Sequence, residues 1–313
     1  MRQTPLLILA YNRADKVRGL IERLREYAPP IVMVVVDGPK PGNVQDEERV
    51  ASVREAVSAI DWTESVLTRF RPVNVGLRRS VVDAVSWAMS EYGQVIVIEE
   101  DVLPGPAFLP YMTAMLERYR DDDRILHVSG YNVVPPDVLS AGASASRLTE
   151  YPESIAWATW DRAWAHFDDD LSWGRAATLP ALHTTTGSWF GALRWRQNLN
   201  DAATGRISTW AYRWVASMWS VGGLSLNPNV NLVEYVGHDE GTNTLTRASW
   251  HDLPVYTGSE VDLLSPTPER DRVADAWVNR IVFRGTAVGV IRGVAITLVL
   301  AARKRRRARA VPS

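Results

Sequence analysis

Polar side chains follow three apolar, strand-like segments in the first hundred residues, and their types suit phosphate and metal chemistry. Tyr11-Asn12-Arg13 follow the segment at 5–10, Asp37-Gly38 follow the one at 31–36, and Glu99-Glu100-Asp101 follow the one at 95–98. Ligands of parallel sheets bind beyond the carboxyl ends of the strands. We therefore expect the three clusters to form one site.

The acidic cluster at 99–101 is the part of this predicted site that most needs a partner. Three consecutive carboxylates repel one another, so the arrangement is easiest to explain with a cation among them. Mg²⁺ and Mn²⁺ prefer such oxygen ligands and often bind one or two carboxylates together with substrate phosphates. We expect Asp101 to hold the metal, with Arg13, Arg78 or Arg79 helping to neutralise a phosphate. A solvated acidic turn is the alternative interpretation.

Motifs and composition exclude several other functions. The chain has neither G-x-G-x-x-G after its first strand nor G-x-x-x-x-G-K-[ST], which disfavours a Rossmann dehydrogenase and a P-loop NTPase. Its 313 residues include 35 basic and 36 acidic ones, and a net charge of −1 argues against specific nucleic-acid binding. The absence of cysteine excludes disulfides, thiolate zinc sites and a cysteine nucleophile. With no secretory signal either, we expect a cytoplasmic location.

Strand-like and helix-like segments alternate over the first 130 residues. Apolar runs predict strands at 5–10, 31–36, 66–70, 95–98 and 125–128, with a helix between each pair. This alternation predicts an α/β fold with a mostly parallel sheet flanked by helices. A loop is predicted at 137–149. Nine of the 13 tryptophans then fall between Trp157 and Trp219, and we expect a Trp-rich lobe packed on the sheet there.

Four short motifs occur in a fixed order: L-A-Y-N-R at 9–13, V-V-D-G-P at 35–39, N-V-G-L-R-R-S at 74–80 and V-I-E-E-D-V at 97–102. Together they resemble the GT-A glycosyltransferases, in particular the N-acetylglucosaminyltransferase I type and its bacterial nucleotide-diphospho-sugar transferase relatives. The resemblance continues through 156–164 and 231–244 and covers most of residues 4–245.

The resemblance implies a domain organisation and a reaction. Residues 1–136 correspond to the nucleotide-sugar-binding half of one GT-A domain and 137–280 to its acceptor-side half, which leaves 281–313 as an apolar helix and polybasic tail. The implied reaction moves a sugar from a nucleotide-diphosphate donor, with a UDP-sugar favoured, to a glycan or lipid-linked acceptor. It inverts the anomeric carbon and uses Mn²⁺ or Mg²⁺.

The resemblance also implies roles for the residues at the strand ends. Asn12 and Arg13 correspond to the Asn-Arg pair after the first strand, whose arginine contacts the nucleotide, and Asp37 to the acidic residue that meets the base.

Residues 99–101 correspond to the E-D-D form of the D-x-D motif. By this match Asp101 binds the divalent metal that bridges the diphosphate. Glu100, which replaces the commoner Asp, lies near the ribose, and Glu99 precedes them in the same motif.

The general base is the residue that the resemblance does not supply. In N-acetylglucosaminyltransferase I it belongs to a Trp-Asp-Asp-Trp stretch, whereas residues 209–214 here read T-W-A-Y-R-W and hold no acid. We favour Asp239, in a Gly-bounded polar loop at 237–241, over Asp161 and Glu240.

Aromatic faces stack on sugar rings, and two tryptophans fall inside the family-like motif at 156–164. Trp157 and Trp160 are therefore predicted to contact the acceptor sugar. Most of the other tryptophans in this region are expected to pack in the core.

The pattern at the end of the chain is compatible with contact with an anionic membrane surface. An apolar stretch at 286–302 precedes R-K-R-R-R-A-R at 303–309, which carries six positive charges. Such a pattern suits a peripheral position on the cytoplasmic leaflet. A docked helix with a solvated tail is the alternative. Nucleic-acid binding by the tail would be non-specific.

Two other functions compete with glycosyl transfer. A sugar nucleotidylyltransferase shares the sheet topology but normally has a Gly-rich, Arg-containing loop after its first strand, where this chain has A-Y-N-R. A non-catalytic glycan-binding protein, or an inactive transferase fold, is the stronger alternative because residue 211 is not an acid.

Overall fold

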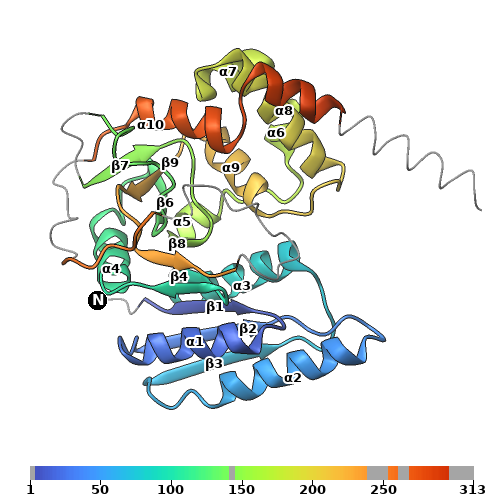
Figure 1. Ribbon diagram of the computed structural model, residues 1–313, viewed down its shortest axis with the longest axis vertical. Coiled ribbons are helices and arrows are strands. Elements are labelled where there is room, and N and C mark those ends of the chain that lie inside the picture. Colours follow the sequence, from blue (N-terminus) through green and yellow to red (C-terminus); the bar gives the residue numbers. More distant parts are fainter. Residues whose placement is uncertain (1–3, 141–144, 238–252, 260–267, 296–313) are drawn as a thin grey trace, which may run out of the picture.

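A computed structural model of the protein describes residues 4–140, 145–237, 253–259 and 268–295 (Figure 1). Its centre is an eight-stranded sheet in the order β3-β2-β1-β4-β8-β6-β9-β7, flanked by helices. The predicted α/β class with a mostly parallel sheet is confirmed, because four of the seven strand pairs described in this sheet are parallel.

The first half of the sheet forms as the alternating pattern predicts. Its elements are β1 (Leu6–Ala10), α1 (Ala14–Arg25), β2 (Ile31–Val36), α2 (Val44–Ser58), β3 (Ser65–Phe70), α3 (Leu77–Tyr92) and β4 (Gln94–Glu99). β1 and β2 are buried along their whole length, as expected for continuous apolar strands with helices on both faces. The chain passes from β1 to β3 in one direction and then returns to place β4 on the other side of β1. The strand order therefore reverses between β1 and β4.

The second half of the sheet differs from the simple parallel order. β6 (Ile125–Ser129) does not pair with β4, because β8 (Ala156–Trp160) lies between them and is antiparallel to both. β9 (Leu224–Pro228) extends the sheet, and β7 (Ser146–Thr149) forms its edge within the stretch predicted as a loop. The loop prediction was wrong for residues 146–149, because β7 is short and takes its pairing from a strand almost eighty residues later. β5 (Val102–Pro104) and β10 (Val233–Tyr235) form a separate antiparallel pair.

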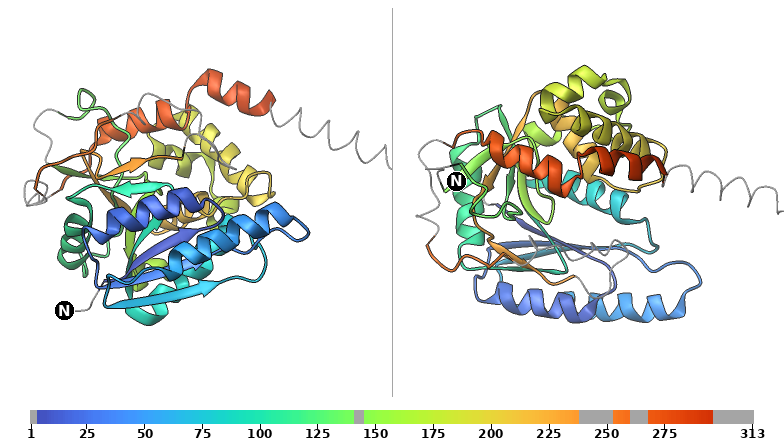
Figure 2. Two further views of the ribbon diagram at one scale, coloured as in Figure 1. Left: turned by 60° about the horizontal axis from the view of Figure 1, so that its bottom comes forward. Right: turned by 45° about the horizontal axis from the view of Figure 1, so that its top comes forward.

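Short helices make up most of the Trp-rich half. They are α5 (Asp161–Trp164), α6 (Ser172–Ala176), α7 (Leu179–Thr186), α8 (Trp189–Ala203) and α9 (Ala211–Ser220), followed later by α10 (Arg272–Trp277) and the π-helical turn η3 (Val278–Val282). α4 (Phe108–Arg118) precedes them, between β5 and β6. In Figure 1, α7, α8 and α10 lie on the side of the molecule opposite α1 and α2, and the right view of Figure 2 keeps that separation. Residues 287–295 are helical as well. No helix in the described part of the chain has both the length and the hydropathy needed to cross a membrane.

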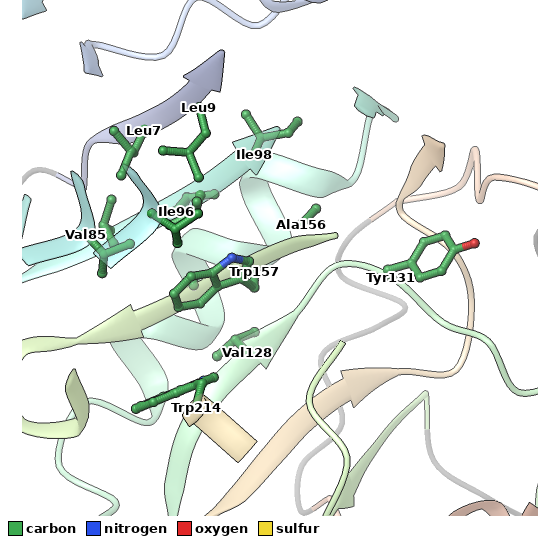
Figure 3. Packing of buried hydrophobic residues seen from close by; sticks show 14 of the residues in the cluster. Leu7, Leu9, Val85, Ile96, Ile98, Val128, Tyr131, Ala156, Trp157 and Trp214 are labelled. Carbon is green, nitrogen blue, oxygen red and sulfur yellow. The ribbon is translucent and has the colours of Figure 1, made fainter. Parts of the chain in front are cut away.

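The core runs through the sheet into the tryptophan cluster. Figure 3 shows Leu7, Ile96 and Val85 on one side of Trp157, and Val128 and Trp214 on the other. The Trp157 ring stacks on His127 and Trp210, with ring centroids 5.2 Å and 5.0 Å away. The tryptophans thus join the two halves into one hydrophobic core.

Candidate functional site

The candidate site lies where the strand order reverses. Leu9 of β1 pairs with Glu99 of β4, so the segments that follow these strands begin side by side. In open α/β sheets this position, beyond the carboxyl ends of the strands, is where ligands bind. Two of the three predicted clusters, at 11–13 and 99–101, therefore meet here.

Arg13 joins the two clusters. Its Nε donates to Glu100 Oε1 at 2.8 Å and its Nη2 to Asp101 Oδ2 at 2.7 Å, while the Tyr11 N–H donates to Glu100 Oε2 at 2.7 Å. Both carboxyl groups are almost fully buried. Burial raises the pKa of Glu100, and the hydrogen bonds from Tyr11 and Arg13 offset this only in part. The guanidinium thus supplies part of the positive charge that three adjacent carboxylates require.

One carboxylate oxygen of Asp101 is buried without a protein partner in the described part of the chain. The residue is 4 % exposed, yet among the described residues its Oδ1 has no hydrogen-bond partner, and neither has Nη1 of Arg13. A buried polar atom without a partner costs free energy unless something else binds it. Gly237 packs directly against the other oxygen, Oδ2, and a Cβ at position 237 would overlap it. The Val236 N–H also donates to the backbone carbonyl of Asp101 at 2.9 Å.

Two further ionisable groups face this pair. Glu99 is partly exposed, but desolvation by the surrounding protein, followed by the charges of Asp101 and Glu100, raises its pKa to about 8. Burial and the charges of Asp101 and Glu99 raise the pKa of Tyr235 to about 12. The site therefore has an excess of negative charge that Arg13 only partly balances.

A divalent cation fits this chemistry only with ligand oxygens from a substrate. Among the described residues no three His, Cys, Asp or Glu side chains are grouped to hold a metal by themselves. Mg²⁺ and Mn²⁺ often use one or two carboxylates with phosphate oxygens. The unpartnered Oδ1 of Asp101 can supply such a ligand.

A second carboxylate, missed by the sequence analysis, organises the neighbouring loop. Asp46, in the first turn of α2, accepts hydrogen bonds from the Tyr11 hydroxyl at 2.5 Å, Asn12 Nδ2 at 2.6 Å and the Lys40 N–H at 2.7 Å. Burial alone would raise the pKa of Asp46, but these hydrogen bonds lower it overall. Asn12 therefore orients the loop through Asp46. The sequence did contain a signal for Asp46, because an acid three residues after an N-cap such as Asn43 is typical of the first turn of a helix.

Asp37 binds the protein's own backbone. Its Oδ1 accepts from the N–H groups of Gly38 and Val75 at 2.9 and 3.0 Å, and its Oδ2 from Asn74 Nδ2 and the Gly76 N–H, both at 3.1 Å. The motifs at 35–39 and 74–80 thus contact each other. Gly38 is required for this approach, since a Cβ there would collide with the backbone of residue 73. Contact between Asp37 and a nucleotide base stays a prediction.

Arg78 and Arg79 already have acidic partners. Arg78 Nη1 lies 2.7 Å from both carboxylate oxygens of Asp169, in the segment between α5 and α6, and Arg79 lies 3.7 Å from Asp83. Both pairs are at least partly exposed to solvent, so they are weak and exchangeable. A phosphate contact by Arg78 stays a prediction, and it would require Arg78 to leave Asp169.

The predicted sugar contacts of Trp157 and Trp160 are wrong. Trp157 is 0 % and Trp160 2 % exposed, and Trp160 Nε1 donates to the Leu116 carbonyl at 3.0 Å. Trp160 also pairs with Gln94, at the end of the sheet remote from Asp101. The motif that carries them is a buried antiparallel strand, so its aromatic rings lie in the core.

Asp161 is exposed, but its position excludes it as a base beside Asp101. It follows Trp160 at the remote end of the sheet, where its N–H donates to the Gly93 carbonyl at 2.9 Å. Asp239, the favoured base, lies outside the described residues, as do His238 and Glu240. The described segment that begins at residue 145 ends at Gly237 beside Asp101, two residues before Asp239.

Comparison with known proteins does not assign the chain to a family. No protein-family model matches it, and no curated protein matches its sequence. One similar solved structure is that of mannose-1-phosphate geranyltransferase from Thermus thermophilus, with a TM-score of 0.35 and 13% identity over 73% of this chain and 74% of that one. At this level of similarity the function has to be inferred from the site itself.

Proposed function

We propose that the protein is a metal-dependent glycosyltransferase that uses a nucleotide-diphosphate sugar, with a UDP-sugar favoured. The observation that carries the proposal is the buried Asp101 at the sheet's reversal point, whose Oδ1, like Nη1 of the neighbouring Arg13, finds no partner among the described residues. A carboxylate oxygen suits a divalent cation and a guanidinium N–H suits a phosphate or ribose oxygen. A nucleotide diphosphate with its cation meets both requirements together.

Each residue of the site then has a stated task. Asp101 would hold Mn²⁺ or Mg²⁺, and Arg13 would keep Glu100 and Asp101 in place while its Nη1 binds the nucleotide. Asn12 and Asp46 would hold the loop after β1 in the conformation that presents Arg13. When bound, the cation would neutralise charge on the diphosphate.

The transfer itself is a direct displacement. A hydroxyl of a glycan or lipid-linked acceptor attacks the anomeric carbon as the bond to the nucleoside diphosphate breaks, which inverts that carbon. A carboxylate takes the hydroxyl proton. Asp239 is the residue proposed for this step.

One observation favours a second candidate, a glycan-binding or inactive protein on the same fold. Residues 209–214 hold no carboxylate, and Trp210 and Trp214 are buried at the start of α9. A base is therefore missing from the stretch that supplies it in N-acetylglucosaminyltransferase I.

Ligand-dependent stability tests the donor site. Nucleoside diphosphates and nucleotide-sugars are added with and without Mn²⁺, and thermal unfolding is followed. Ligand at a hundredfold excess over Kd should stabilise the native state by about 2.7 kcal/mol. We expect a metal-dependent rise in Tm that Asp101→Asn abolishes and Asp15→Asn, the same change at an exposed position of α1, preserves.

Equal stabilisation of wild type and Asp101→Asn would contradict the metal assignment. Release of nucleoside diphosphate from the stabilising sugar donor then separates the two candidates. Turnover favours the transferase, and donor binding without turnover in the presence of acceptor glycans favours the inactive protein.

A further inference from the structure

A cavity of about 600 Å³ lies between α7, α8 and the segment from α10 to residue 287. In Figure 1 these elements are on the side of the molecule away from α1 and α2. Arg270, on the cavity wall, bridges to Leu148 of the edge strand β7. Four strand spacings separate β7 from β4, a span of roughly 19 Å. The cavity is therefore distinct from the Asp101 site.

The cavity wall carries excess positive charge. Arg270 is neutralised, because it lies 2.7 Å from Glu150 and 3.1 Å from Asp275. Arg272 and Arg280 also line the cavity, are exposed, and form no salt bridge with any described residue. Of the described residues on the wall, Asp275 is the one that is acidic, and it is already bonded to Arg270. The guanidinium groups of Arg272 and Arg280 can therefore bind an anion.

The wall also has an acceptor that needs a donor. Asn279 is 2 % exposed and its Nδ2 donates to the Thr186 carbonyl at 3.3 Å, but its Oδ1 has no partner within the described ranges. A Cβ at Gly191 or Gly285 would overlap the Asn279 amide, so these glycines leave the room that it occupies. A buried acceptor of this kind beside two arginines suits a ligand with both an anionic group and a hydroxyl.

The rim of the cavity exposes apolar side chains. Phe190 of α8 and Ala287 both line the cavity, and Phe190 is exposed. Beyond Ala287, Val288 is 75 % and Ile291 68 % exposed in the helical residues 287–295. This last helix is fixed against α8, since Gln197 Nε2 donates to the carbonyl of residue 290 at 3.0 Å. Exposed apolar residues beside arginines are typical of membrane-interface surfaces.

We propose that this cavity binds the headgroup of an anionic lipid that carries phosphate and hydroxyl groups. Arg272 and Arg280 bind the phosphate, Asn279 accepts from a headgroup hydroxyl, and Phe190, Val288 and Ile291 enter the acyl boundary. Charge complementarity favours this occupant, because six further basic residues follow at 303–309. The inference is independent of the transfer reaction.

Vesicle partitioning of the full-length protein, without nucleotide or divalent metal, tests the proposal. The vesicles are phosphatidylcholine alone, or phosphatidylcholine with about one third phosphatidylglycerol. A basic residue near an anionic surface strengthens binding about fivefold. Arg272→Gln/Arg280→Gln should therefore lower partitioning to the anionic vesicles about 25-fold, the product of two such factors. Arg18→Gln/Arg49→Gln, on exposed positions of α1 and α2, makes the same charge change and should have little effect.

An apolar variant tests the rim separately. Val288→Ser/Ile291→Ser changes exposed side chains, so the Tm should stay the same while vesicle binding falls. Any of three vesicle results overturns the proposal. Arg272→Gln/Arg280→Gln partitions like the wild type, which assigns binding to the tail; the α1/α2 control loses as much binding; or the protein does not bind anionic vesicles. Stabilisation by soluble glycerol phosphate without vesicle binding also overturns it, because it identifies a soluble ligand instead of a lipid.

Discussion

Arg13→Met removes the one guanidinium that, among the described residues, bonds both Glu100 and Asp101. The two ion-pair distances are 2.8 and 2.7 Å, and the side chains are 19 % exposed for Arg13 and 6 % for each acid. Methionine keeps much of the length and none of the charge. The variant therefore leaves two buried carboxylates without their counter-charge, while Glu100 retains the Tyr11 N–H.

The size of the effect follows from burial. Removing one partner of a buried ion pair costs about 3–5 kcal/mol, because the other charge stays desolvated. We expect Arg13→Met to lower the free energy of unfolding at pH 7 by about that amount. Arg13→Lys should lose less, since lysine restores a charge but cannot form the forked pair of hydrogen bonds.

Urea unfolding followed by tryptophan fluorescence measures this loss. Arg25→Met, at the end of α1, is the matched control, because Arg25 pairs with Asp61 at 3.2 Å but the two side chains are 48 % and 74 % exposed. The exposed Arg25–Asp61 pair should contribute at most about 1 kcal/mol to the free energy of unfolding. If Arg13→Met costs no more than Arg25→Met, water screens the Arg13 pairs, and the argument for a desolvated, ligand-ready Asp101 fails.

Two further predictions concern buried polar groups. His127 is fully buried between Trp214 Nε1 and the Glu153 carbonyl, and burial lowers its pKa to about 3 from 6.5. The neutral imidazole makes its full contribution to the free energy of unfolding above pH 6.5 and loses it as the pH falls. At pH 5 the free energy of unfolding should be lower by about 2 kcal/mol. His127→Gln should remove this loss in urea titrations at pH 8 and pH 5, and an unchanged pH dependence would contradict the buried neutral imidazole. In Asp37→Asn an amide NH₂ group replaces the carboxylate oxygen that accepts from Asn74 Nδ2 and the Gly76 N–H, so donors face donors. The change should lower the free energy of unfolding by about 1–3 kcal/mol. Hydrogen exchange at Val75 and Gly76 should accelerate, and full protection in the variant would refute the role of Asp37 in fixing this loop.

Local sequence determined the first half of the fold. The run I-V-M-V-V-V at 31–36 is apolar and almost entirely β-branched, so it suits a strand covered on both faces. Apolar residues at helical spacing predicted α1 and α3 in the same way. Because strands and helices alternate, the parallel order and the shared edge at 11–13 and 99–101 followed from connectivity alone.

Long-range pairing decided the rest. The insertion of β8 between β4 and β6 joins residues about sixty positions apart on one side and about thirty on the other, and no local pattern encodes that choice. The same pairing buries Trp157 and Trp160, whose ring types alone suit a sugar as well as a core. Asp46 acquires its role only when α2 brings it to Tyr11 and Asn12.

The sequence therefore determined which residues are able to do chemistry at the sheet edge, because residue type and the succession of strands and helices along the chain are local properties. The tertiary structure decided which of them are desolvated and which already have partners. Arg13, Glu100 and Asp101 became one buried unit, whereas Asp37 was bonded by its own backbone. Burial and hydrogen bonding depend on the packing of segments distant in sequence, and these two quantities set the reactivity of a polar group.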